Sequence, residues 1–134
     1  NIADPDPNLE GGAPSCFSQG FALGGARFNR LEGIFRGEGG SIYFLSTSGG
    51  NAQFGQLWQY IPDGTGGKLV LVYESTAGAL LDSPDNLCVT PSGGILFCED
   101  DSNAVADGRV DDTDPLAPGI KDVNRLVGLA RDGA

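Results

Sequence analysis

Short apolar segments separated by glycine-rich turns recur along most of this chain, and this pattern is its strongest constraint on the fold. The segments are rich in aromatic and branched residues, which favour strands. The 22 glycines among 134 residues suit a chain with many tight turns. We predict strands at Leu31–Phe35, Ser41–Ser46, Gln56–Ile61, Lys68–Glu74, Leu87–Thr90, Ile95–Cys98 and Arg125–Ala130. The predicted fold class is all-β.

The spacing of these strands indicates how they are grouped. Four strands within about 45 residues, joined by tight turns, match one blade of a β-propeller. The same pattern then begins again. We predict that residues 27–134 form a partial β-propeller of about two blades, which is incomplete: one blade at about 27–78 and a second, partial blade at about 83–134 with a polar loop at 101–122. Residues 1–26 are predicted to be an extended N-terminal arm or linker, with 15–26 as an irregular strand.

Charge and composition exclude several classes of function. The formal charge is −10, from 18 acidic and 8 basic residues. Such a surface repels nucleic acid and anionic lipid, and it attracts cations. The chain has no histidine, which excludes Ser-His-Asp and Cys-His catalysis and histidine-ligated zinc. No apolar segment approaches the ~20 residues of a membrane-spanning helix.

The segment from Ser83 to Asp101 is predicted to be a hairpin with acidic ends. Asp85 and Asn86 precede its first strand, and Glu99 follows its second. Because paired strands lie about 4.8 Å apart, we expect the carboxylates of Asp85 and Glu99 to lie side by side. A cation between them would relieve their repulsion. Oxygen ligands of this kind favour calcium or magnesium and can hold iron(III). The alternative is a solvated acidic turn.

A second polar pair lies where the first blade begins. Strand alternation would place Arg30 and Glu32 on one face. A guanidinium can bind phosphate there, and the neighbouring carboxylate can bind a metal. The alternative is an ordinary exposed ion pair of little energetic value. The pair precedes the first blade as Asp85 and Asn86 precede the second, and the entrances of successive blades converge on the axis of a propeller.

The cysteines leave two arrangements open. Cys88 and Cys98 lie on the two strands of the predicted hairpin. Direct opposition would allow a disulfide in an oxidising compartment. An offset register, which we favour, would leave one or both as small buried apolar residues. Cys16 is then unpaired.

Several motifs follow one another in a defined order: Arg30-Leu31-Glu32-Gly33, SIYFLSTSGG, GQLWQY, LVYES, Pro84-Asp85-Asn86-Leu87 and Cys98-Glu99-Asp100. This ordered set, which covers about residues 20–100, resembles the PhoX-type alkaline phosphatases. This resemblance implies part of a six-bladed β-propeller. It also implies phosphomonoester hydrolysis at an axial site with calcium and iron(III), and export to the periplasm or the cell exterior. The implied metal ligands are Glu32, Asp85, Asn86 and Glu99, and Arg30 would contact the substrate phosphate.

The chain also departs from that family. Members are several times longer, and their N-terminal half supplies further carboxylates and an iron-ligating cysteine; we do not assign Cys16 to that role. The sequence begins at Asn1 without an initiator methionine, so either a precursor was trimmed at its front or this is a portion of a longer chain. We favour a portion, or an incompletely identified mature protein. Three explanations compete: a fragment of a whole enzyme that needs the remaining blades, an oligomer that builds a ring from partial copies, or a degenerate structural subunit. The functional alternative to a phosphatase is therefore a non-catalytic acidic binding or scaffolding subunit of a larger complex.

Overall fold

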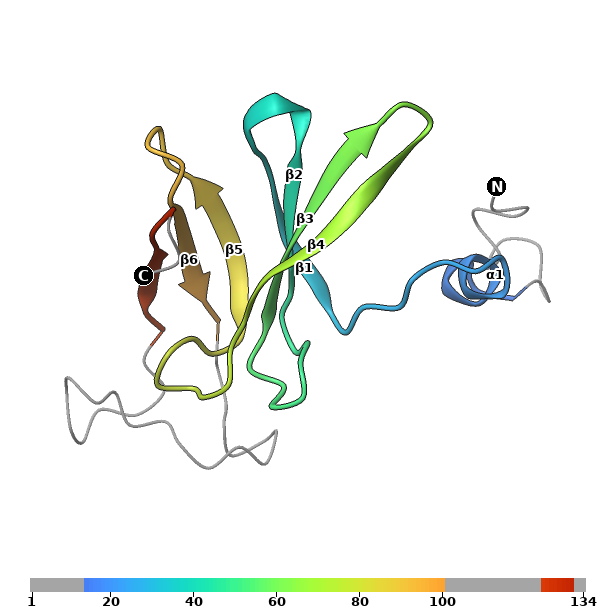
Figure 1. Ribbon diagram of the computed structural model, residues 1–134. Coiled ribbons are helices and arrows are strands. Elements are labelled where there is room, and N and C mark those ends of the chain that lie inside the picture. Colours follow the sequence, from blue (N-terminus) through green and yellow to red (C-terminus); the bar gives the residue numbers. More distant parts are fainter. Residues whose placement is uncertain (1–13, 101–123, 132–134) are drawn as a thin grey trace.

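The computed structural model describes residues 14–100 and 124–131, in which one helix precedes two antiparallel sheets (Figure 1). The sheets confirm the all-β prediction and form two blade-like units without ring closure. All seven predicted strands are present, with ends that shift by a few residues. Residues of the predicted arm before Pro14 and the predicted polar loop at 101–122 lie outside the described residues.

Sheet A is a four-stranded meander. Its strands follow the order of the chain: β1 (Leu31–Arg36), β2 (Ile42–Ser46), β3 (Gln56–Asp63) and β4 (Gly66–Glu74). The register aligns Ile34, Phe44, Trp58 and Leu71 in one row across all four strands. Because side chains alternate along a strand, this row lies on the face opposite Leu45 and Leu57.

Sheet B repeats the beginning of this arrangement with three strands, β5 (Pro84–Val89), β6 (Ile95–Glu99) and β7 (Leu126–Leu129). The turn from β5 to β6 closes as the turn from β1 to β2 does. The N–H of Thr90 donates to the carbonyl of Gly94, and that of Gly37 donates to Ser41, both at 2.8 Å. Gly40 and Gly93 hold equivalent positions at φ 80° and 86°, where a side chain would be strained.

The hydrophobic core lies between the facing sides of the two sheets. Its buried members are Leu45, Leu57, Leu81, Leu87, Ile95 and Phe97, with Tyr43, Tyr73, Val89, Val127 and Leu129 packed around them. The inner strands β1 and β5 approach closely at Gly33, where an added Cβ would lie 2.8 Å from the Cα of Asn86. The two sheets therefore pack face to face along β1 and β5, as the ribbon shows (Figure 1).

The predicted irregular strand at 15–26 is wrong, because Cys16–Ala22 forms helix α1. The Ser15 side chain accepts a hydrogen bond from the N–H of Ser18 at 3.2 Å and so caps the first turn. Phe17 and Phe21 stack one helical turn apart, with ring centroids separated by 6.1 Å. Short glycine-rich sequence thus forms a helix here because a serine cap and an aromatic pair stabilise it.

The cysteines follow the offset register and form no disulfide. Cys88 pairs with Leu96, and Cys98 pairs with Asn86. Cys88 is half-buried and Cys98 is exposed, so neither is fully buried, although the offset register was expected to bury one or both. The cause is the side-chain direction: Cys98 alternates with the buried Phe97 and faces away from the core.

Candidate functional site

The entrance of β1 combines a strained residue with a β-bulge. Arg30 has a φ of 54°, a left-handed conformation that is uncommon for a residue with a side chain. Its carbonyl accepts the N–H of Thr47 at 2.8 Å, and Leu31 then pairs with Ser46. A bulge follows before Ile34 joins the ladder. Glu32 lies inside this bulge and is exposed.

The entrance of β5 has the same construction. Ser83 has a φ of 44°, and its carbonyl accepts the N–H of Asp100 at 3.1 Å. Pro84 pairs with Glu99, and a bulge follows before Asn86. Asp85 therefore occupies in β5 the position that Glu32 occupies in β1. The structure thus gives the two predicted entrances equivalent backbones.

The two entrances are joined to each other. The buried Thr47 hydroxyl, at the end of β2, donates to the carbonyl of Pro84 at 2.7 Å. At Gly33 the backbone of β1 approaches that of β5, and a Cβ would lie 2.8 Å from the carbonyl oxygen of Asp85. Glu32 and Asp85 therefore lie at the same end of neighbouring inner strands. Neither carboxylate makes a hydrogen bond or ion pair within the described ranges.

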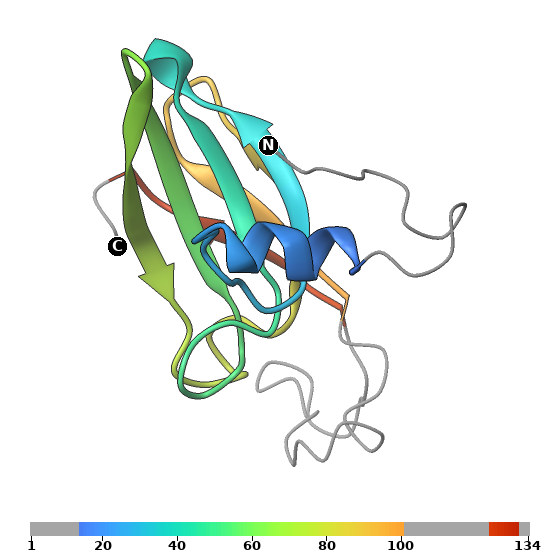
Figure 2. The same ribbon diagram turned by 90° about the vertical axis from the view of Figure 1, so that its right-hand side faces the viewer.

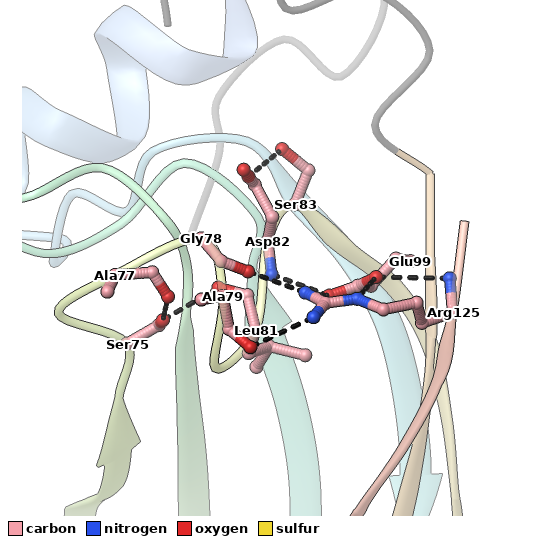
Figure 3. A network of polar contacts seen from close by, with 9 residues as sticks. All are labelled: Ser75, Ala77, Gly78, Ala79, Leu81, Asp82, Ser83, Glu99 and Arg125. Carbon is pink, nitrogen blue, oxygen red and sulfur yellow. Dashed lines mark hydrogen bonds and ion pairs between the residues drawn. The ribbon is translucent and has the colours of Figure 1, made fainter. Parts of the chain in front are cut away.

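Glu99 occupies a different environment from the one predicted. Figure 3 shows its carboxylate turned toward Arg125 and the loop before β5. One oxygen accepts the N–H of Asp82 and an Nη2–H of Arg125, both at 2.7 Å. The other accepts the backbone N–H of Arg125 at 3.0 Å and its Nε–H at 2.7 Å. The cation beside Glu99 is thus a guanidinium, and four donors satisfy its carboxylate.

Arg125 also holds the loop that leads into β5. Its Nη1 donates to the carbonyl of Ala79 at 2.9 Å and its Nη2 to that of Gly78 at 2.5 Å (Figure 3). Ser75 closes the same loop, because its hydroxyl lies 2.6 Å from the carbonyl of Leu81. The Glu99 side chain is only 2% exposed in this ion pair. Glu99 and Arg125 together therefore fix the approach of the chain to β5.

The remaining predicted residues are accessible. Arg30 and Asn86 are exposed, and Asp85 is half-buried. The side-chain oxygen of Asn86 accepts the N–H of Leu87 at 2.9 Å. The common face predicted for Arg30 and Glu32 relied on strand alternation, but β1 begins only at Leu31 and bulges after it. The structure brings Glu32, Asp85 and Asn86 to one end of the inner strands and turns Glu99 toward Arg125.

A further carboxylate at this end of sheet A is already engaged. Glu74 pairs with Gln56 across the ladder, and Gln56 pairs with Ser46. The Gln56 amide donates to Glu74 at 2.7 Å, and the N–H of Asn51 donates at 3.1 Å. The hydrogen bond from Gln56, and next that from Asn51, lower the pKa of Glu74 below its ordinary value of 4.5. Glu74 therefore stabilises a loop as an anion.

The described residues satisfy the requirements of a metal site only in part. Among them, no group of three or more histidine, cysteine or acidic side chains could hold a metal ion. Glu32 and Asp85 have the right chemistry, since ionised carboxylates are the usual oxygen ligands of calcium. Glu32 can supply carboxylate oxygens from β1, and Asp85 can supply them from β5. Two such residues make an incomplete coordination shell, because calcium takes six to eight oxygens.

Sequence reasoning missed the residues that hold the entrances. Thr47, Ser46 and Arg125 act through hydrogen bonds and an ion pair that join segments distant in the sequence. No local motif marks such residues. The one available signal was the placement of polar residues directly after two matching apolar strands, at Ser46-Thr47 and Glu99-Asp100.

Comparison with known proteins places this arrangement in a family. A family model described as alkaline phosphatase PhoX matches residues 13–115, which include α1, sheet A and the hairpin of β5 and β6. Neither the curated proteins nor the solved structures contain a match to the chain. Within the described ranges, no helix has the length and apolar character needed to cross a membrane. The kind of function that follows is that of a phosphatase, and the chain belongs to the PhoX alkaline phosphatase family.

Proposed function

We propose that this chain contributes one side of a phosphomonoester-hydrolysing site at the entrances of β1 and β5. Arg30 would contact the substrate phosphate, and Glu32, Asp85 and Asn86 would supply oxygen ligands to calcium and iron(III). The family match across both entrances is the observation that carries this proposal. Export of the protein, to the periplasm or the cell exterior, belongs to the same proposal.

The chain's own residues have defined parts in this proposal. The Arg30 guanidinium is exposed and can bind two phosphate oxygens through parallel N–H donors. Its left-handed backbone is the kind of local strain that is often found at functional sites. Bound metal ions would supply neutralisation of charge and polarisation of the phosphoryl oxygen. Glu32 and Asp85 would orient the substrate indirectly, by fixing the position of those ions.

The role of Glu99 as a metal ligand is a prediction that requires a change in its present hydrogen bonds. Its oxygens accept hydrogen bonds from Asp82 and Arg125, so metal binding would first require Arg125 to move away. Leaving a buried charge without its partner is costly. Glu32 and Asp85 carry no such requirement, and they are therefore the stronger candidates.

Calcium binding provides the direct test of the proposed metal ligands at the entrances of β1 and β5. We expect Glu32→Gln and Asp85→Asn each to weaken calcium binding, measured by titration calorimetry, by at least tenfold, since a lost charged ligand costs about 1.4 kcal/mol or more. Glu38→Gln is the matched control, because Glu38 lies in the turn at the far end of β1. Equal affinities in all three variants would contradict the proposed site.

Phosphatase activity tests the role of Arg30. With calcium and iron(III) supplied, hydrolysis of p-nitrophenyl phosphate should fall strongly in Arg30→Gln and less in Arg30→Lys, because lysine keeps the charge and loses the planar fork. Arg36→Gln, at the other end of β1, should keep the activity of the unaltered chain. An Arg30→Gln variant as active as the unaltered chain would remove Arg30 from the site.

A non-catalytic role is the second candidate, and one observation favours it. The face of sheet A that points away from sheet B is apolar, and Ile34 on it is 65% exposed. Exposed apolar surface of this kind marks interaction sites. A chain that binds neither calcium nor phosphate, yet forms a stable complex through this face, would be an acidic binding or scaffolding subunit derived from the same fold.

A further inference from the structure

Thr47 directly follows β2 and binds the backbone at both strand entrances. Its N–H donates to the carbonyl of Arg30 at 2.8 Å, and its hydroxyl donates to the carbonyl of Pro84 at 2.7 Å. Figure 1 and Figure 2 show the loop after β2 and the loop before β5 at the same end of the two sheets. Thr47 is 2% exposed, so both hydrogen bonds are shielded from water. One buried residue thus links the start of β1 to the start of β5.

The bond to Arg30 supports a strained backbone. Arg30 is left-handed, and such a conformation persists where the surrounding contacts hold it. The preceding residue in β2, Ser46, holds the other side of Arg30, because its hydroxyl accepts the N–H of Asn29 at 3.1 Å and donates to the carbonyl of Asn29 at 2.7 Å. The end of β2 therefore sets the direction in which the Arg30 side chain leaves the backbone.

The bond to Pro84 sets the position of Asp85. The Pro84 carbonyl belongs to the peptide group that it shares with Asp85, and this group is planar, so holding the carbonyl also orients the N–H of Asp85. The rest of Pro84 is held as well. Its side chain is fully buried, and a Cβ on Gly55 would lie 2.5 Å from the Pro84 Cδ, which shows how closely the ring packs there. The backbone at Asp85 thus follows the position of Thr47.

The second entrance separates the two hydrogen bonds of Thr47 by purpose. At that entrance the N–H of Asp100 donates to the carbonyl of Ser83 at 3.1 Å, as the N–H of Thr47 does to Arg30. A carboxylate can only accept hydrogen bonds, so Asp100 has no equivalent of the threonine hydroxyl as a donor. The backbone bond therefore belongs to the general construction of an entrance. The hydroxyl bond is an addition that joins sheet A to sheet B.

We propose that Thr47 is the positioning residue that fixes Arg30 relative to Asp85. This inference rests on the proposed function, in which Arg30 contacts the substrate phosphate and Asp85 supplies oxygen to calcium. A fixed relation between the two side chains allows a cation at Asp85 and a phosphate at Arg30 to strengthen each other's binding. Thr47 itself is buried and touches neither ligand in this proposal. It acts through the backbone of the two residues that do.

The coupling between calcium and phosphate tests this role in the intact protein. Inorganic phosphate is titrated by calorimetry with and without calcium, and the ratio of the two Kd values measures the coupling. Thr47→Val keeps the shape and the backbone N–H but removes the hydroxyl, so we expect this ratio to fall by about fivefold or more. Thr47→Ser keeps the hydroxyl and should keep the ratio of the unaltered protein. Thr47→Ala also lacks the hydroxyl, and it should lower the ratio as valine does if valine prevents folding.

A matched control removes a threonine hydroxyl at the other end of β5. The Thr90 hydroxyl donates to the carbonyl of Gly94 at 3.1 Å in the turn between β5 and β6. Thr90→Val should therefore keep the coupling ratio, although it also loses a hydrogen bond to the backbone. Calcium titrated with and without phosphate must give the same ratio in every variant, because coupling between two binding sites is reciprocal.

The outcomes distinguish the positioning role from the proposed function. If Thr47→Val lowers stability in urea but keeps the ratio, Thr47 has a structural role alone and the inference is overturned. It is overturned too if Thr47→Ser loses the ratio, because the hydroxyl would then not be the group that acts. An unaltered protein whose phosphate affinity does not depend on calcium would overturn the proposed function, and the role of Thr47 with it.

Discussion

At the start of β1 the N–H of Asn29 is held by the hydroxyl of Ser46 at 3.1 Å, whereas at the start of β5 the N–H of Asp82 is held by the carboxylate of Glu99 at 2.7 Å. The backbone is the same in both places, with a left-handed residue, a strand pair and a bulge. The side chains that hold this backbone differ between the two sheets. In sheet A a neutral hydroxyl both donates and accepts, and in sheet B the buried anion of Glu99 pairs with a partly buried cation, Arg125.

This difference shows that the entrance geometry is preserved while the chemistry that holds it changes. A hydroxyl suffices in sheet A because Ser46 can donate to the carbonyl of Asn29 and accept from its N–H. In sheet B the strand β7 brings Arg125 beside Glu99, so the same anchor also binds the loop at Gly78 and Ala79. The second entrance therefore depends on residues far apart in the sequence.

The largest effect should come from removing the anchor of sheet B. We expect Glu99→Ala to lower the free energy of unfolding by about 3–5 kcal/mol, because it leaves the partly buried Arg125 without its partner. The matched change in sheet A, Ser46→Ala, should cost less, about 1–3 kcal/mol, as for the loss of two ordinary hydrogen bonds. Urea unfolding of both variants measures the difference. Similar losses would show that the two anchors are energetically equivalent.

A smaller effect is expected where the two sheets touch. Gly33→Ala places a Cβ 2.8 Å from the backbone of both Asp85 and Asn86, and a backbone cannot move aside as a flexible side chain can. Overpacking of this kind costs about 1–3 kcal/mol. Gly66→Ala is the control, since a Cβ there would meet nothing within 4 Å. Urea unfolding measures the free energy of unfolding of both variants, and equal stability of the two would contradict the close approach of β1 to β5.

The smallest effect should be a pH dependence confined to sheet A. Hydrogen bonds lower the pKa of Glu74 in the folded chain, so its contribution to stability is complete above about pH 4.5 and is lost as the pH falls through the lowered value. The stability difference between the unaltered chain and Glu74→Gln should therefore shrink on acidification below that pH. Thermal unfolding across this range measures it. A difference that does not change with pH would mean that Glu74 is not held as an anion.

The strands and their grouping could be predicted because their signals are local. Aromatic and branched residues favour strands, and glycine-rich turns separate them, so β1 to β7 were located with small errors at their ends. The helix Cys16–Ala22 was missed because glycines obscured its serine cap and its pair of phenylalanines. The repeat itself is weak in sequence, since few matched positions are identical, among them Ile42 with Ile95 and Phe44 with Phe97.

The candidate site, too, could be predicted from the sequence only in part. The positions of Arg30, Glu32 and Asp85 at strand entrances followed from the spacing of the strands. The surroundings of Glu99 did not, because Arg125 is 26 residues away in sequence and reaches it only after β7 pairs with β6. A pair of carboxylates at a hairpin end suggested a metal ion, and the tertiary structure supplied a guanidinium for one of them.

By itself, the sequence determined the all-β class, the order of the strands and the acidic residues at the ends of the inner strands. These depend on periodicity and turn residues, which act over a few positions. Only the tertiary structure decided which carboxylates are neutralised internally, how closely β1 and β5 approach, and which apolar faces are covered. Those features depend on contacts between segments that are distant in the chain, and such contacts exist only once the two sheets have packed together.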